Sequence, residues 1–214
     1  LSPTRPPYCG CTTKSVERIG IPSYKWLTET NTCAAGAGKQ STVFVGPLNM
    51  AASFNRSSWW MKGDVISSEL RITNNRGTGE AGLTGFGPNI NTIKDPRYGR
   101  NSELPSEDPF LSGQYAVHYV RGMQQVSSGH LKMLSYLKHY TAYNVETNRF
   151  VFVANVTQFD FWDSYLPQYK MALTEGGASG VMCSYFAPNG VSSCGNPWLL
   201  NTLIRSEWAR PDAV

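Results

Sequence analysis

Side chains able to bind a polar ligand gather in residues 82–100, where an apolar segment gives way to a loop. Asp95, Arg97 and Arg100 follow one another within six residues of this loop. The two arginines offer planar forks of hydrogen-bond donors, and the aspartate can accept hydrogen bonds or hold one of the arginines. Neighbouring hydroxyl groups, as a sugar ring presents them, match this combination of donors and acceptor. Rigidly held loops often carry binding residues, so the stretch is the first candidate for a site.

Further candidates follow the ends of other predicted strands. Lys138 and His139 stand together near the end of an apolar segment, and Tyr185 follows another. In a parallel barrel, binding residues lie at the carboxyl ends of the strands, which groups these residues with Arg100. Five aromatic residues have the chemistry to stack on a sugar face: Trp26, Phe86, Tyr98, Tyr185 and Trp198.

Each candidate also has a structural interpretation. An ion pair with Asp95 or Glu107 would account for one of the two arginines. Lys138 and His139 would also suit the solvated end of a helix. Packing in the core accounts for most of the aromatic side chains.

The elements that must position these residues alternate between strand and helix. Short buried strands are predicted at 42–47, 85–93 and 180–185, and helices at 57–74, 108–126, 159–176 and 197–208. Residues 131–139 fit either the start of a helix or the end of a strand, and residues 1–20 form an irregular lead-in. Such alternation predicts an α/β fold with a parallel sheet.

Composition narrows the class of protein. The 214 residues carry a net charge of +4 and contain no block of basic residues, which argues against nucleic-acid binding. No apolar run approaches the roughly 18–20 residues that span a bilayer. Neither a Gly-x-Gly-x-x-Gly turn nor a complete phosphate-binding loop is present, so the sequence predicts no nucleotide cofactor.

The cysteines and histidines do not form a metal motif. Five cysteines include no Cys-x-x-Cys pair, and the three histidines are widely spaced, so neither a metal nor a cofactor is expected. Cys183 and Cys194 flank a turn at 188–190 and form either a local disulfide or two unlinked thiols. Asn55 and Asn155 match the N-glycosylation pattern, which together with the cysteines favours a secreted or extracytoplasmic protein.

Several multi-residue motifs occur in a familiar order along nearly the whole chain. They include Pro88-Asn89-Ile90-Asn91, Asp95-Pro96-Arg97-Tyr98-Gly99-Arg100, Leu137-Lys138-His139-Tyr140 and Val181-Met182-Cys183-Ser184-Tyr185. In this order they resemble the N-terminal catalytic domain of glycoside hydrolase family 3, in its β-xylosidase and β-glucosidase branch.

This resemblance implies a TIM-type (β/α) barrel and retaining, exo-acting hydrolysis of terminal β-linked xylose or glucose. It assigns the hydroxyls of the terminal sugar to Arg100, Lys138 and His139. Glu29 stands where the family has a carboxylate that grips the same sugar, and Tyr185 would lie near the reacting carbon. Asp95 and Arg97 are expected to brace the loop. The implied partner is an oligosaccharide or β-glycoside, without nucleic acid or a membrane span.

The sequence departs from the family pattern in the residues that cleave the bond. The family's nucleophile is an aspartate expected just beyond Val214, and its acid/base residue comes from a later region. Asp212 follows a proline rather than a strand and is not assigned as the nucleophile. After Glu29, residues 30–33 replace the family's Leu-His-Gly.

The chain is also shorter than the about 250 residues of a closed barrel. Residues 1–214 are therefore interpreted as one partial domain, with half to two-thirds of a barrel. It would be a piece of a longer polypeptide, or a truncated relative that needs a partner chain.

Three interpretations follow. The first is a glycoside hydrolase for which this chain supplies the sugar-binding half and is inactive alone. The second is a catalytically silent sugar-binding or structural protein of the same fold. The third, the family's N-acetylhexosaminidase branch, is disfavoured because Thr141-Ala142-Tyr143-Asn144 replaces that branch's Pro-Gly-His-Gly loop.

Overall fold

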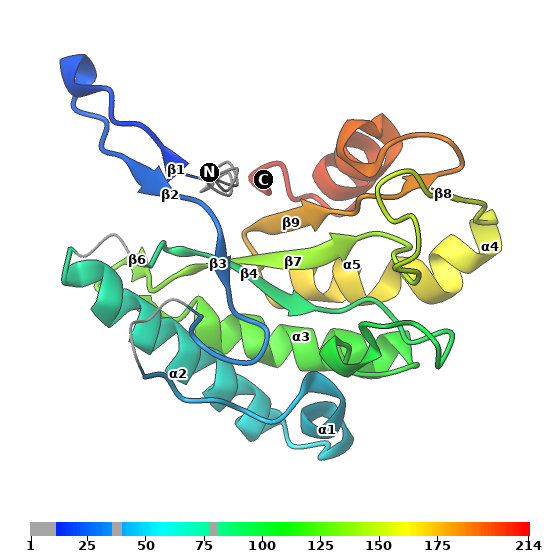
Figure 1. Cartoon of the computed structure of the whole chain (residues 1–214), viewed down its shortest axis with the longest axis horizontal. Coiled ribbons are helices and arrows are strands. Elements are labelled where there is room, and N and C mark those ends of the chain that lie inside the picture. Colours follow the sequence, from blue (N-terminus) through cyan, green and yellow to red (C-terminus); the bar gives the residue numbers. More distant parts are fainter. Residues whose placement is uncertain (1–11, 36–39, 78–80) are drawn as a thin grey trace, which may run out of the picture.

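A four-stranded parallel sheet forms the centre of the molecule (Figure 1). The computed structural model describes residues 12–35, 40–77 and 81–214. The strands are β3 (Thr28–Glu29), β4 (Thr84–Asn89), β7 (Leu134–Tyr140) and β9 (Gly180–Cys183), hydrogen-bonded in the order β3-β4-β7-β9. All three neighbouring pairs are parallel. Their carboxyl ends therefore lie along one edge of the sheet.

Helices connect each strand to the next. α1 (Pro47–Ala52) and α2 (Arg56–Asn75) join β3 to β4, α3 (Pro109–Met123) joins β4 to β7, and α5 (Pro167–Thr174) precedes β9. Figure 1 shows α2, α3 and α5 side by side beneath the sheet. The spatial order of the strands follows the chain without a reversal, as in a barrel wall and unlike a doubly wound sheet.

Short elements complete the described chain. They are β1 (Thr12–Thr13), η1 (Glu17–Ile19), β2 (Tyr24–Lys25), η2 (Asn101–Glu103), β5 (Val126–Ser127), β6 (His130–Leu131), β8 (Val153–Ala154), α4 (Gln158–Asp160), η3 (Phe161–Tyr165), β10 (Ala187–Pro188), η4 (Ser193–Gly195) and η5 (Trp198–Glu207). Within the described ranges, no helix is both long and apolar enough to cross a membrane.

Local sequence explains where the two long helices begin and how closely they pack. The Asn55 side chain accepts from the Ser58 amide at the start of α2, and Asp108 caps α3 just before Pro109. Where the helices cross, a Cβ on Gly63 would lie 2.1 Å from the Tyr119 carbonyl oxygen. Only glycine permits this approach of the two backbones.

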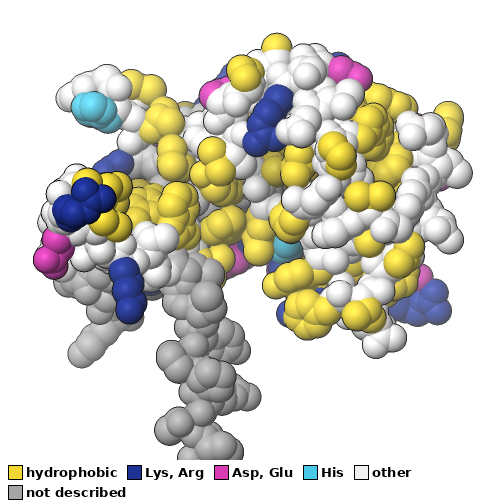
Figure 2. Space-filling model, turned by 90° about the horizontal axis from the view of Figure 1, so that it is seen from above, with side chains coloured by type: hydrophobic (Ala, Val, Ile, Leu, Met, Phe, Trp, Pro, Cys, Tyr) yellow, Lys and Arg dark blue, Asp and Glu magenta, His cyan; other side chains and the backbone are white. Residues whose placement is uncertain are grey.

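Two apolar clusters flank the helix layer. One includes Leu137, Tyr140 and Tyr169 and lies between the sheet, α5 and η5. The other includes Trp59 and Tyr115 and joins α2 to α3. The opposite side of the molecule, seen from above in Figure 2, also shows hydrophobic side chains gathered across its middle.

The predicted strand at 42–47 is wrong. Val43 makes a single bridge to Cys33, remains 74% exposed, and is followed by Pro47 at the first position of α1. The segment is apolar enough for a strand, but within the described ranges no neighbouring strand extends that bridge into a ladder.

The predicted helix at 159–176 is divided into α4, η3 and α5. The Leu166 amide bonds to the Phe161 carbonyl, five residues back, and Pro167 has no amide hydrogen to continue the pattern. The helix predicted at 197–208 forms as η5, also with wide π-type turns. The ambiguous segment 131–139 contains most of strand β7.

The lead-in predicted at 1–20 is tested only in part. Residues 1–11, with Cys9 and Cys11, lie outside the described residues, whereas β1 and η1 occupy part of 12–20. Among the residues that the structure describes, Cys33 forms no disulfide.

Candidate functional site

The sequence-predicted binding residues lie near the carboxyl ends of neighbouring strands. Glu29 ends β3, Lys138 and His139 are the two residues before the last residue of strand β7, and Tyr185 follows β9 by two residues. Arg100 reaches them from the loop after β4, as its 3.5 Å separation from the His139 Nε2 atom shows. Residues far apart in the sequence therefore form one polar cluster.

Lys138 and Glu29 form an ion pair across the sheet. The Lys138 side chain is 3% exposed, whereas the Glu29 side chain is half exposed. One Glu29 oxygen binds the lysine ammonium, and the other accepts from the backbone amides of Thr30 and Asn31 at 3.0 and 2.9 Å. The pair fixes the ammonium while leaving the carboxylate accessible to a ligand.

Arg100 is held by a carboxylate that the sequence analysis did not single out. Its guanidinium donates two hydrogen bonds to Glu103, at 2.9 and 2.7 Å, and the Asn89 amide donates to the same carboxylate at 3.2 Å. Burial alone would raise the pKa of Glu103, but the hydrogen bonds and charge of Arg100 lower it overall. The carboxylate is therefore anionic and orients the arginine.

Hydrogen bonds from the Asn91 side chain hold the backbone of His139 in place. The Asn91 side chain accepts from the His139 amide and donates to its carbonyl, each at 2.9 Å. Burial, followed by the positive charges of Lys138, Arg100 and Arg149, lowers the pKa of His139 to about 2. The imidazole is therefore neutral at physiological pH, able to donate from one nitrogen and accept at the other.

Glu146 forms a second anionic contact beside Arg100. It accepts from the Tyr143 hydroxyl at 2.7 Å and from Arg149 at 3.1 Å, and it lies 3.6 Å from the Arg100 guanidinium. The Tyr143 ring packs edge-on against the His139 ring, with centroids 5.0 Å apart. One carboxylate thus links two arginines and a tyrosine next to the histidine.

Tyr185 lies at the outer side of this cluster and is 47% exposed. It stands between Cys183 and Cys194, which form a disulfide with Cα atoms 5.2 Å apart. Of the two states that the sequence leaves open, the structure has the linked one. The disulfide closes the loop that carries the tyrosine.

Asp95 and Arg97 bind each other rather than the cluster. Their side chains form an ion pair at 2.6 Å, and the Arg97 amide also donates to Asp95 at 2.8 Å. These hydrogen bonds lower the pKa of Asp95 to about 2. The Arg97 side chain is 88% exposed, so the pair closes a surface loop.

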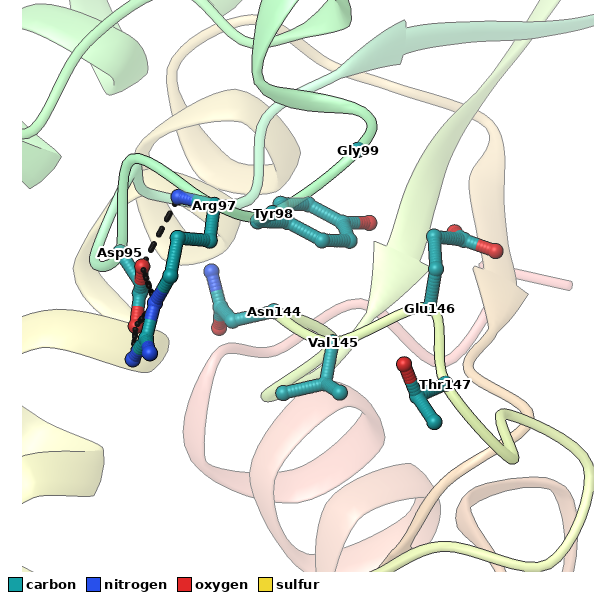
Figure 3. A pocket seen from close by; sticks show the side chains of 8 residues that line it. All are labelled: Asp95, Arg97, Tyr98, Gly99, Asn144, Val145, Glu146 and Thr147. Carbon is teal, nitrogen blue, oxygen red and sulfur yellow. Dashed lines mark hydrogen bonds and ion pairs between the residues drawn. The ribbon is translucent and has the colours of Figure 1, made fainter.

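A pocket of about 270 Å³ lies between this loop and residues 144–147. Figure 3 shows the Asp95–Arg97 pair at one side of the pocket and Glu146 at the other, with the Tyr98 ring between them. The pocket adjoins the polar cluster through Glu146, whereas Lys138 and His139 do not line it.

Sequence reasoning missed three members of the cluster, namely Asn89, Glu103 and Glu146. It considered Glu107 as a partner for an arginine, but Arg100 pairs with Glu103. The spacing of three residues within a helical turn was the available signal. Nothing comparable marks Glu146, which depends on the course of the loop after β7.

Every carboxylate named in this cluster contacts a cation. Glu29 pairs with Lys138, Glu103 with Arg100, and Glu146 with Arg149. Asp212 lies elsewhere, is 66% exposed and pairs with Arg210. The cluster is suited to binding hydroxyl groups, since charged donors and acceptors are fixed side by side. Within the described ranges, no three His, Cys, Asp or Glu side chains gather in a way that would hold a metal ion.

The two glycosylation candidates are exposed. Asn55 caps α2 through its side-chain oxygen, which leaves its amide nitrogen directed away from that bond. Asn155 follows β8 at the surface.

A parallel α/β wall is the arrangement of a (β/α) barrel, and the polar cluster lies at the carboxyl ends of its strands, where barrels usually carry their binding residues. Residues 11–209 match the family described as the glycosyl hydrolase family 3 N terminal domain, and the chain belongs to this family.

Relatives agree with this assignment. The chain is 42% identical to a β-xylosidase/α-L-arabinofuranosidase of Medicago sativa subsp. varia and to β-D-xylosidase 3 of Arabidopsis thaliana, in each case over 90% of this chain and 27% of the relative. The chain thus spans only about a quarter of the length of these relatives.

Solved structures show the same fold. A family 3 exo-β-xylosidase, XlnD, in complex with a xylobiose aziridine probe superposes with a TM-score of 0.83 and 31% identity, covering 92% of this chain and 27% of that one. A Bifidobacterium adolescentis family 3 β-glucosidase gives 0.81 and 31%, covering 93% and 28%. The architecture is therefore part of a TIM-type barrel.

Proposed function

We propose that this chain is the sugar-binding part of an exo-acting, retaining glycoside hydrolase that removes terminal β-linked xylose or glucose. The observation that carries the proposal is the pairing of two cations, buried Lys138 and partly buried Arg100, with Glu29 and Glu103 at one edge of the sheet. Family membership and the names of the relatives support the same conclusion.

In this proposal the terminal sugar lies against Lys138, His139 and Arg100. The two cations donate to neighbouring hydroxyls, neutral His139 donates or accepts, and the accessible carboxylate of Glu29 accepts from a hydroxyl. Tyr185 lies beside the reacting carbon. Such contacts lower the barrier when they strengthen as positive charge develops on the sugar.

Cleavage itself requires two carboxyl groups about 5–5.5 Å apart. The carboxylates of the cluster are engaged by cations, which suits anionic binding groups better than a proton-donating acid. We therefore propose that the nucleophile and the acid/base belong to other parts of the whole protein. Residues 1–214 then form one partial domain that binds sugar without turning it over.

The remaining proposals concern the whole protein. Its substrate would be an oligosaccharide or β-glycoside, and its location extracytoplasmic. The disulfide between Cys183 and Cys194 supports this location, because such bonds persist in oxidising compartments. Attachment of glycans at the exposed Asn55 and Asn155 would fit the same location.

Hydrolysis of aryl β-xylosides and β-glucosides by the full-length protein tests the proposal. Arg100→Ala or Lys138→Ala should each reduce kcat/KM by about tenfold to a few hundredfold, since each removes a charged hydrogen bond to the sugar. Lys170→Ala, at an exposed position on α5, is the matched control. Near-normal activity of both site variants would refute the binding assignment.

The same full-length protein also tests the alternative interpretation, a catalytically silent sugar-binding protein. A full-length protein that binds xylose or glucose through Lys138 yet cleaves no glycoside would be a sugar-binding protein of the same fold. Turnover by residues 1–214 alone would instead reveal a carboxyl pair within this chain.

A further inference from the structure

A hollow lies where α2 begins beside α3. Its volume is about 260 Å³, and it is lined by Arg56, Ser57, Trp60 and His118. Trp60 follows Arg56 by four positions and Ser57 by three, so these residues share one face of α2, while His118 reaches the hollow from α3. The hollow is therefore separate from the polar cluster at the carboxyl ends of the strands, since it shares no residue with that cluster.

The lining combines an aromatic ring with hydrogen-bond donors and includes no carboxylate. Trp60 is partly exposed, and the Arg56 guanidinium donates to the Gln114 side chain at 3.3 Å. Burial, followed by the positive charges of Arg121 and Arg56, lowers the pKa of His118 below its ordinary value of 6.5, so its imidazole is neutral at physiological pH. A sugar ring can pack its apolar C–H face on the indole while its polar groups bind the arginine and the histidine.

Asn55 offers an attachment point for a sugar directly beside the hollow. It precedes two of the lining residues in the acceptor pattern Asn55-Arg56-Ser57. Its side-chain oxygen accepts from the Ser58 amide at 3.1 Å, and no hydrogen bond among the described residues uses its amide nitrogen. A glycan can therefore be joined to this nitrogen while the oxygen continues to cap α2.

We propose that Asn55 is N-glycosylated and that the first N-acetylglucosamine of its glycan packs into this hollow against Trp60. The inference rests on the extracytoplasmic location in the proposed function, because a lipid-linked oligosaccharide pyrophosphate must supply the glycan. The Asn55 amide nitrogen loses a proton and bonds to the anomeric carbon of the donor. The bond from that carbon to the pyrophosphate breaks, and the pyrophosphate leaves on the lipid. Once joined, the sugar is tethered beside the hollow, so weak contacts are enough to hold it there.

Peptide mass spectrometry of the full-length protein, purified from its source organism, tests the attachment. Release of the glycan by peptide N-glycosidase in heavy-oxygen water converts a glycosylated asparagine into a labelled aspartate. We expect the label at Asn55, and none in a Ser57→Ala variant secreted by a eukaryotic host. This variant loses the acceptor pattern but keeps the Asn55 cap. An unlabelled Asn55 in the purified protein would overturn the inference.

The rate of glycan release from the folded protein tests the packing. Trp60→Ala should speed release at Asn55 about five- to tenfold, because the first sugar loses its aromatic contact and the enzyme reaches the bond more often. Trp60→Phe keeps a ring and should stay near the parent rate. Trp162→Ala is the matched control, since this tryptophan is 45% exposed and does not line the hollow.

A second variant decides the question if Trp60→Ala does not fold. Arg56→Ala changes an exposed side chain, keeps the acceptor pattern, and should speed release about threefold by removing a donor to the sugar. A parent-like rate in the folded Trp60→Ala variant, or in Arg56→Ala where the first does not fold, would overturn the packing.

These measurements do not depend on turnover, so the two proposals can fail separately. A protein whose Asn55 glycan is protected by Trp60, but which neither binds nor cleaves a glycoside, would refute the proposed function alone. An active glycoside hydrolase with a bare Asn55 would refute this inference alone.

Discussion

Two lysines of this protein are almost fully buried, and their surroundings differ. Lys138 is 2% exposed at the end of β7 and pairs with the carboxylate of Glu29. Lys62 is 0% exposed within α2, where its ammonium donates to the Tyr115 hydroxyl at 3.1 Å and lies near that ring. No ion pair to Lys62 is present among the described residues.

The difference separates a cation that a ligand can use from one that only affects stability. Lys138 has a carboxylate as its partner, and that carboxylate reaches solvent at the candidate site. Lys62 lies in the apolar cluster between α2 and α3, and burial lowers its pKa to about 8. Nothing in the structure explains the choice of lysine at this position.

Removing the anion of the first lysine should have the largest effect. Glu29→Gln leaves the Lys138 ammonium buried without a counter-charge and should lower the free energy of unfolding by about 3 kcal/mol, at the lower end for buried pairs because Glu29 is half exposed. Urea denaturation measures the change. Adding Lys138→Met should recover most of the loss, and a double variant as unstable as the single one would contradict the explanation.

Removing the second lysine should act in the opposite direction. Lys62→Met fills a similar volume without a charge and should raise the free energy of unfolding by about 2 kcal/mol at pH 7. The folded pKa is near 8 and the ordinary value is 10.5. The gain should therefore be complete below pH 8, shrink between pH 8 and 10.5, and vanish above pH 10.5, where the lysine becomes neutral in both states. Destabilisation at pH 7 would show that the charge is compensated.

His139 should make stability depend on acidity. Its folded pKa is near 2 and its ordinary value is 6.5, so below pH 6.5 the unfolded chain takes up a proton that the folded protein does not. This group alone should lower the free energy of unfolding by about 1.4 kcal/mol at pH 5.5.

Denaturation at pH 7.5 and 5.5 measures this dependence. His139→Asn should reduce the difference between the two pH values. His130→Asn, at an exposed position in β6, should leave it as in the parent protein. An undiminished difference in His139→Asn would assign the acid sensitivity to other groups.

The exposed ion pair should contribute least. Asp95→Asn removes the carboxylate that binds Arg97, but both groups face water, where such pairs have little effect on stability. We expect no resolvable change in melting temperature and full binding of xylose. A marked loss of sugar binding would show that this loop positions Arg100.

Sequence predicted the elements with strong patterns. The helices at 57–74 and 108–126 form with capped starts, and the strands after Leu83 and Ser179 appear where they were expected, although the first ends at Asn89. Periodicity and capping are local, so they are readable without the fold. The segment at 42–47 failed because a strand needs a neighbour, which no local pattern supplies.

Part of the candidate site was also predictable from the sequence. Arg100, Lys138 and His139 do lie together, because parallel strands bring their carboxyl ends to one edge. Of the two carboxylates beside Arg100, Glu103 was signalled by its spacing of three residues, whereas Glu146 was not predictable, since it arrives through an irregular loop. Whether a buried lysine has an anion likewise depends on contacts between residues distant in the chain, as Lys62 and Lys138 show.

The disulfide between Cys183 and Cys194 has a consequence for the outer part of the binding surface. It closes the loop that contains Tyr185, whereas Lys138, Arg100 and His139 lie outside that loop. Adding a reductant would therefore loosen the loop that carries Tyr185 before it disturbed the sheet. Contacts that a ligand makes with Tyr185 would then depend on the redox potential of the surroundings, and contacts with Lys138, Arg100 and His139 would depend on it less.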